Sequence, residues 1–249
     1  MKAVLVIPCY NEEARLRVDL VGALLTRLDL SVRFVDDGST DRTPQILSDI
    51  RDTYPGRVLV QRLDKNVGKS KAVARGLRSA LKRPDVAALG YADADFATPA
   101  RELLRLLERL EAHELDAVWG ARVALMGSNI RRSLMRHLLG RVFATAAALA
   151  LGEVVYDTQC GAKWFRRTPV LEAALEHDFD SNWAFDVELF GRLFGAFGAP
   201  SLDRARCQEV ALESWTDVPE SKVTLPGMVE SLADLGFLWA KRKRFGRRR

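Results

Sequence analysis

The chain has 249 residues, 48% of them hydrophobic, which is enough for one large domain with a sizeable core and excludes a disordered chain. No apolar run approaches the roughly 18 residues of a membrane-spanning helix. The formal charge of +5 comes from a tail: residues 241–249 carry seven Lys or Arg, and the rest carries 31 basic and 33 acidic residues. The nearly neutral body argues against a nucleic-acid-binding protein, and we expect no nucleic-acid partner.

The cysteines and the N-terminal residues indicate a compartment. Cys9, Cys160 and Cys207 are odd in number and lack metal-site spacing, which favours free thiols in a reducing environment. The apolar run at 3–7 is too short for a signal peptide, and acidic residues follow it. We therefore expect a cytoplasmic protein.

The first half of the chain alternates apolar runs with helical periodicity. Strands are predicted at 3–7, 32–35, 58–61, 86–91 and 116–120, separated by helices at 12–30, 41–54, 68–81 and 99–112. Strict strand–helix alternation predicts an α/β fold whose parallel sheet has right-handed crossovers. In such sheets ligands bind at the carboxyl ends of the strands.

After residue 121 this alternation stops. The pattern predicts a partly amphipathic helix at 129–151, an irregular segment leading to a short strand at 156–167, a helix at 183–197, a strand at 210–215 and an amphipathic helix at 226–240. No internal repeat or linker interrupts the chain. We predict a single domain over 1–240, followed by the basic tail at 241–249.

Two carboxylates, Asp93 and Asp95, follow the predicted strand at 86–91. In extended backbone they share one face about 7 Å apart, and they repel unless a cation lies beside them. Such oxygen ligands suit Mg²⁺ or Mn²⁺ that also holds a phosphate. The alternative is an acidic turn in which Asp95 or Thr98 caps the next helix.

Several familiar sites are absent from the sequence. Gly68-Lys69-Ser70 lacks the preceding glycine of a P-loop, and neither a dinucleotide fingerprint nor a nucleophile elbow is present. The three histidines lie in helical or exposed polar settings. A His-based triad or a zinc site is therefore poorly supported.

Polar motifs at the predicted strand ends form an ordered set. They are Pro8–Glu13, Asp36–Asp41, Asn66–Ala72, Asp93–Asp95, Asp157–Lys163 and Trp183–Leu189. In this order the set resembles the family 2 glycosyltransferases, and most of all the dolichyl-phosphate β-glucosyltransferases and polyprenyl-phosphate glycosyltransferases. The resemblance covers roughly residues 2–225. It implies a GT-A fold, a Rossmann-like mixed, mainly parallel sheet flanked by helices.

The resemblance implies an inverting transfer of a hexose, glucose from UDP-glucose, to a polyprenyl or dolichyl-type phosphate. Residues 1–121 then form the nucleotide-sugar-binding half, and residues 122–240 form the acceptor half with amphipathic helices. The alternative is a family member that acts on a sugar or other hydroxyl acceptor, with Asp186 as general base.

The resemblance also assigns residues to the donor. Pro8 shapes a turn and Tyr10 stacks on uracil, while Glu12 and Asp37 accept hydrogen bonds from the ribose hydroxyls and the ring N–H. Lys69 approaches phosphate or base, and its alternative is a solvated helix cap. An Asx turn is the alternative for Asp36 and Asp37.

The resemblance also implies a metal, Mg²⁺ or Mn²⁺, at Asp93 and Asp95. Asp95 is the direct ligand of this metal, and Asp93 contacts metal or ribose. The cation neutralises charge on the departing diphosphate.

For the acceptor, an anionic phosphate needs cations rather than a base. The resemblance points to Arg122, Arg131, Arg132 and Lys163 as acceptor-phosphate residues. Asp157 is expected to orient Lys163, and Asp186 to bind sugar hydroxyls or orient Lys163. Headgroup contact or plain solvation is the alternative for the arginines.

Membrane contact follows from the implied acceptor and from composition. The helix at 129–151 combines arginines with an apolar face, and the helix at 227–240 places Trp239 next to the basic tail. Both features suit peripheral contact with an anionic membrane, on its cytoplasmic face. The alternative is a core helix with a solvated tail.

Overall fold

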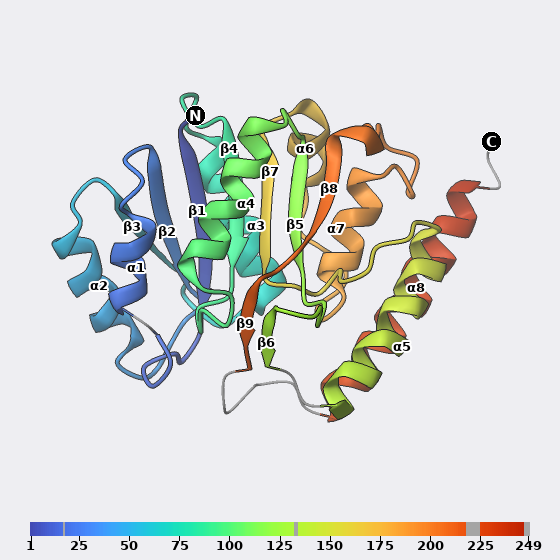
Figure 1. Cartoon of the computed structure of the whole chain (residues 1–249), viewed down its shortest axis with the longest axis horizontal. Helices are drawn as coiled ribbons and strands as arrows, with labels where there is room; N and C mark the ends of the chain where they lie inside the picture. Colours follow the sequence, from blue (N-terminus) through green and yellow to red (C-terminus); the bar gives the residue numbers. More distant parts are fainter. Residues whose placement is uncertain (17, 132–133, 218–224, 247–249) are drawn as a thin grey trace.

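A mixed sheet organises the molecule (Figure 1). The computed structural model describes residues 1–16, 18–131, 134–217 and 225–246. The described residues form a seven-stranded sheet in the order β3-β2-β1-β4-β7-β5-β8. Its strands are β1 (Ala3–Cys9), β2 (Leu30–Asp36), β3 (Val58–Arg62), β4 (Ala88–Ala92), β5 (Ala117–Ala121), β7 (Ala162–Arg166) and β8 (Cys207–Ala211). A short parallel pair, β6 (Asn129–Arg131) and β9 (Ser214–Thr216), lies apart from it.

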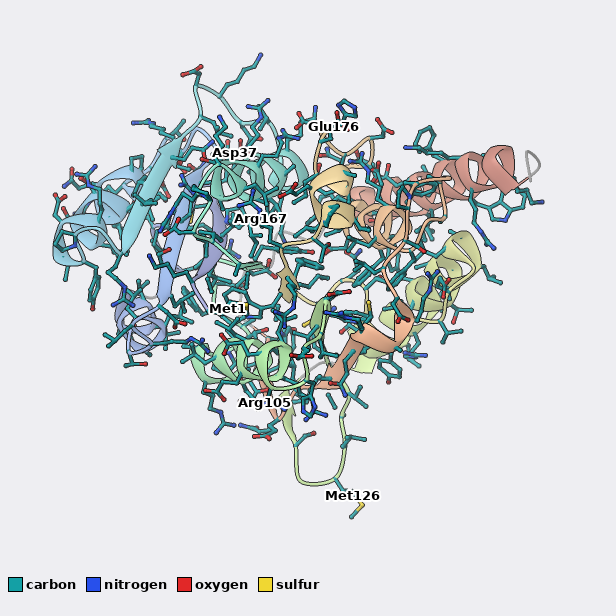
Figure 2. The ribbon with its side chains drawn as sticks, turned by 90° about the horizontal axis from the view of Figure 1, so that it is seen from above. Met1, Asp37, Arg105, Met126, Arg167 and Glu176 are labelled. Atoms are coloured by element: carbon teal, nitrogen blue, oxygen red, sulfur yellow. The ribbon has the colours of Figure 1, made fainter. Side chains whose placement is uncertain are left out.

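Helices cover both faces of the sheet (Figures 1 and 2). One face packs against α1 (Val18–Leu24), α2 (Thr43–Thr53) and α4 (Ala100–Ala112), and the other against α3 (Lys69–Leu81), α6 (Pro169–Ala174) and α7 (Phe185–Leu193). A 3₁₀ turn at Arg204–Arg206 precedes β8. Because both faces are covered, β4 and β5 are buried along their whole length, which explains their uninterrupted apolar sequences.

Strand β7 is antiparallel to both of its neighbours, β4 and β5, whereas the other strand pairs of the sheet are parallel. Lys163 pairs with Tyr91, and Ala162 pairs with Ala92. The start of β7 therefore lies at the edge where β4 ends, which brings the segment before it next to Asp93. The prediction of a mixed, mainly parallel α/β fold is confirmed.

Four predicted elements differ from the observed ones. The last helix continues to Gly246, into the segment predicted as a basic tail. The predicted helix at 12–30 is reduced to α1, because the segment after β1 bonds to the start of α2: Glu12 N–H donates to Thr43 Oγ1 at 2.8 Å. The predicted helix at 129–151 begins with β6 and becomes α5 (Leu134–Leu151). The predicted strand at 210–215 divides into β8 and β9, because the chain leaves the main sheet to pair with β6.

The long helices α5 and α8 (Leu225–Gly246) lie against each other at one side of the molecule (Figure 1). Their inner faces bury Ala147, Ala150, Leu151, Leu235 and Leu238. On α5, Leu138, Val142 and Leu149 are exposed, and on α8 so are Leu232, Phe237 and Trp239, each between 45% and 70%. Among the described residues, no helix is both long and apolar enough to cross a membrane.

Candidate active site

A cavity of about 700 Å³ opens at the carboxyl ends of β1, β2, β4 and β5. Nine of the residues predicted from the sequence line it: Pro8, Tyr10, Glu12, Asp37, Lys69, Asp93, Asp95, Arg122 and Asp186. The wall continues onto residues 140–144 of α5 and onto Ser231 and Leu232 of α8. One cavity therefore connects the acidic strand ends to the helix pair.

At one end of the cavity, Asp37 joins the loop after β2 to the start of α3. Its two carboxylate oxygens accept backbone N–H groups from Val67 at 2.8 Å and Gly68 at 2.9 Å. Burial raises the pKa of Asp37, and these two bonds offset part of that rise. The neighbouring Asp36 makes the Asx-type turn instead, because its Oδ1 accepts the N–H of Ser39 at 2.9 Å.

Glu12 lies beside Tyr10 in the same wall, and its carboxylate is paired with Arg15 at 2.7 Å. Sequence reasoning missed Arg15, because the segment after β1 was predicted to be helical. The feature of the sequence that could have indicated Arg15 is its position two residues after the motif Pro8–Glu13. The Glu12–Arg15 pair places one cation among the acidic residues at this end of the cavity.

The Asp93–Asp95 pair lies at the centre of the cavity. Lys69 Nζ is 2.6 Å from Asp93 Oδ1, and Asp95 Oδ1 accepts the Ala97 N–H at 3.0 Å. Burial raises the pKa of Asp95, and the negative charge of Asp93 raises it further. For Asp93, burial acts in the same direction but is outweighed by Lys69, so its pKa is lowered. Phe96, next in the chain, adopts a left-handed φ of 50°, which turns the chain out of the strand direction.

This carboxylate pair fits a divalent cation that is shared with a ligand. Two carboxylates close enough to raise a pKa are hard oxygen donors that a cation stabilises. The described residues contain no group of three or more His, Cys, Asp or Glu side chains arranged to hold a metal. Asp93 and Asp95 are thus suited to a metal that takes its remaining ligands from phosphate oxygens and water.

At the other end of the cavity, Arg122 and Asp157 form a two-pronged ion pair. The guanidinium Nε and Nη2 lie 2.7 and 2.8 Å from the carboxylate oxygens, and the Arg122 backbone N–H donates to Oδ2 at 3.1 Å. Burial alone would raise the pKa of Asp157, but Arg122 outweighs it and holds the pKa at about 2. The Arg122 guanidinium also stacks over Trp215, 5.4 Å from the ring centre. This cation is therefore fixed in place on the cavity wall.

Lys163 differs from its predicted role. Its side chain is 0% exposed and lies behind the cavity wall, with Nζ 2.8 Å from Asp186 Oδ1 and donating to the Cys160 carbonyl. The Tyr91 hydroxyl donates to the same Asp186 oxygen. Lys163 orients Asp186 and, because β7 points it into the core opposite Tyr91, does not reach a phosphate in the cavity. Asp157, expected to orient Lys163, pairs with Arg122 instead.

Two arginines predicted to bind the acceptor phosphate have no described side chain. Arg132 is outside the described residues, and only the backbone of Arg131 is described, at the end of β6. Arg141 of α5 lines the cavity and stacks 3.9 Å from the centre of the Tyr156 ring. The sequence marked Arg141 only as one of several helix arginines, and its place in the cavity required the fold.

Comparison with known proteins gives the class of this chain. The model for glycosyl transferase family 2 matches residues 4–173. The chain belongs to this family and is a glycosyltransferase, as the strand-end motifs predicted. The fold agrees: a UDP complex of glucosyl-3-phosphoglycerate synthase from Mycobacterium tuberculosis superposes with a TM-score of 0.67 at 18% identity, covering 97% of this chain and 79% of that one. TarS of S. aureus, also with UDP, gives 0.59 at 18% identity, covering 97% and 65%.

Within the family, the relatives indicate a subgroup. The human dolichyl-phosphate beta-glucosyltransferase is 32% identical over 88% of this chain and 68% of its own length. The Dictyostelium discoideum protein of the same name is 28% identical over 88% and 67%. Glycosyltransferase AglD of Haloferax volcanii is 31% identical over 75% of this chain and 30% of its own. The chain thus spans about two thirds of the two glucosyltransferases.

Proposed function

We propose that this enzyme transfers a hexose, glucose from UDP-glucose, to the phosphate of a polyprenyl lipid of the dolichyl type. The observation that carries the proposal is one continuous cavity, which has an aromatic and acidic end, a fixed Arg122 cation opposite, and a wall reaching α5 and α8. The names of the relatives and the UDP bound in the structural neighbours point to the same donor and acceptor.

The donor belongs at the end formed by β1, β2 and α3. Tyr10 offers a ring to uracil, Glu12 and Asp37 offer oxygens to the ribose, and the start of α3 with Lys69 faces the phosphates. When bound, Mg²⁺ or Mn²⁺ at Asp95 and Asp93 neutralises charge on the departing diphosphate. A neighbour whose structure contains Mn²⁺ and UDP supports this expectation, with a TM-score of 0.68.

The acceptor phosphate belongs beside Arg122. Asp157 and Trp215 hold that guanidinium in one orientation, so little freedom is lost when it binds a phosphate. A phosphate oxygen then attacks the anomeric carbon from the side opposite UDP. A bond to the acceptor oxygen forms, the bond to the UDP oxygen breaks, and the configuration inverts. Arg141, on the same wall, offers a second cation.

Asp186 distinguishes this proposal from a hydroxyl acceptor. A general base for a hydroxyl needs a carboxylate ready to accept a proton. Asp186 Oδ1 already accepts hydrogen bonds inside the protein, from the Lys163 ammonium at 2.8 Å and from the Tyr91 hydroxyl. A phosphate acceptor is already an anion and requires no base, so this arrangement supports the lipid phosphate.

The helix pair supports peripheral membrane contact, which we place on the cytoplasmic face. The outward apolar side chains of α5 and α8 lie on elements that also line the cavity. Lys243 lies 3.7 Å from the centre of the Trp239 ring, so a cation accompanies the exposed aromatic side chain. Apolar and cationic side chains on one surface suit an anionic lipid interface. A polyprenyl phosphate would then reach Arg122 from the membrane.

The test is a transfer assay with matched acceptors. Radiolabelled nucleotide-sugars are incubated with the enzyme and either a polyprenyl phosphate or the corresponding polyprenol, and the lipid phase is extracted. Label from UDP-glucose is expected in the phosphate sample only, and Arg122→Gln should remove it. Label in the polyprenol sample would favour the hydroxyl-acceptor alternative. No label in any lipid with any nucleotide-sugar would refute the proposal.

A further inference from the structure

Helix α8 is attached to the rim of the cavity by one carboxylate. Asp234 Oδ2 accepts three successive backbone N–H groups, from Asn182 at 3.1 Å, Trp183 at 3.0 Å and Ala184 at 3.1 Å. These groups immediately precede α7, whose own N-cap residue, Ala184, provides no side-chain cap. A negative charge at the N-terminal end of a helix also suits the helix dipole. Asp234 therefore holds the turn that leads into α7 from another helix.

The turn at 182–184 forms part of the cavity wall. Asn182 Oδ1 is 2.9 Å from the position that a Cβ on Gly68 would occupy, so the turn rests against the start of α3, beside Lys69. Asn182 and Trp183 line the cavity. Asp186, in the first turn of α7, holds Lys163 at 2.8 Å. A shift of this turn would therefore move Asn182, Trp183 and Asp186 in the cavity wall.

A second contact strengthens the attachment one to two turns further along α8. Lys241 Nζ lies 2.7 Å from Asp180 and 3.6 Å from Glu188. Glu188 in turn accepts the N–H and hydroxyl of Ser181, at 2.9 and 2.8 Å. Between Asp234 and Lys241, the buried Leu235 and Leu238 complete the inner face of α8. The inner face is thus fixed to α7 at two polar points, while Phe237 and Trp239 of the same helix are exposed.

We infer that Asp234 is a positioning residue for hexose transfer. It holds the 182–184 turn, and through that turn Asp186 and Asn182, in the arrangement that the reaction needs. The inference rests on the proposed function. The principal donor contacts, at Tyr10, Asp37 and Asp95, belong to other elements. Loss of Asp234 should therefore lower turnover and leave UDP binding nearly intact.

The experiment compares Asp234→Ala and Asp234→Asn with Glu230→Ala, a matched control that removes an exposed carboxylate from the same helix. Amide hydrogen exchange, UDP affinity by calorimetry, and kcat and KM for transfer are measured on the full chain. Asp234→Ala should speed exchange at 182–184 and lower kcat about tenfold or more, with UDP affinity changed less than about twofold. Asp234→Asn, whose amide oxygen still accepts N–H groups, should retain part of the slow exchange at 182–184 and part of the kcat that Asp234→Ala loses. Glu230→Ala should match the wild type.

Two results would overturn the inference. One is a kcat for Asp234→Ala equal to that of Glu230→Ala. The other is exchange that rises throughout the protein together with a parallel loss of UDP affinity, which would indicate a general structural role. If Asp234→Ala does not fold, Asp234→Asn alone is judged by the same criteria. A wild type that binds UDP but transfers no hexose would refute the proposed function, and exchange at 182–184 would then decide whether Asp234 holds the turn.

Discussion

Gly161 lies directly beneath the Asp93 carboxylate, and this contact gives a sharp test of the site. A Cβ on residue 161 would lie 2.1 Å from Asp93 Oδ2 and 2.3 Å from its Cγ. To reach ordinary van der Waals contact, the carboxylate would have to move by roughly 1 Å. That shift would break the 2.6 Å pair with Lys69 and displace one of the two proposed metal ligands. We therefore expect Gly161→Ala to lower hexose transfer about 100-fold, since errors of this size in a reacting site have such effects.

The assay combines transfer from UDP-glucose, calorimetry of UDP with Mn²⁺, and thermal unfolding. Crowding at residue 161 should cost about 1–3 kcal/mol of stability, so the variant should still fold. Gly236→Ala is the matched control, because nothing lies within 4 Å of that position on α8. It should keep wild-type transfer and gain at most about 1 kcal/mol from helix propensity. A folded Gly161→Ala enzyme with transfer within about twofold of the wild type would refute the role assigned to Asp93.

Three further outcomes are expected. Asp157→Asn, which leaves the Arg122 charge unpaired and buried, should lower the free energy of unfolding by about 3 kcal/mol in urea titrations at pH 7. The folded-state pKa of Asp157, about 2, lies below its ordinary value. The stabilisation by the ion pair is therefore present above about pH 4 and is lost as the pH falls through about 2. A difference in unfolding free energy between wild type and Asp157→Asn that persists undiminished near pH 2 would contradict the assignment. Chelation of divalent cations should weaken UDP binding about tenfold or more, and in Asp95→Asn the UDP affinity should no longer depend on these cations. Equal UDP affinity of the wild type with and without chelator would exclude the metal. Replacing Phe237 and Trp239 together by serine should reduce flotation with anionic vesicles by at least about tenfold while UDP binding stays unchanged. Unaltered flotation would exclude α8 from the membrane contact.

The sequence predicted the fold of residues 1–121 well because most elements there carry their own periodic signal. The apolar runs of β1, β4 and β5 and the leucines of α4 are strong local patterns. The prediction was wrong where distant contacts decide the local structure. In the loop after β1, the Asn11 and Glu12 N–H groups donate to Ser39 and Thr43, so a pattern with helical spacing forms only a turn at residues 12–16.

The site was predictable as a set of residue types, but not in its pairings. Lys163 and Asp157 lie in one motif, yet Asp157 pairs with Arg122 and Lys163 pairs with Asp186. These ion-pair partners follow from the antiparallel direction of β7, which the spacing of residues along the chain does not reveal. The contact between Asp234 and the start of α7 joins residues about fifty positions apart, and nothing in either segment alone indicates it.

The antiparallel insertion of β7 has a consequence for how this protein must fold. β7 lies between β4 and β5, although it follows both of them in the chain by at least forty residues. A fragment ending at residue 121 would leave β4 and β5 without the strand that joins them, each with an unpaired edge prone to association. The central pairing must wait for β7, and such distant contacts slow folding. The sheet formed by residues 1–121 is therefore not a separate module, because its completion depends on a strand that emerges later from the ribosome.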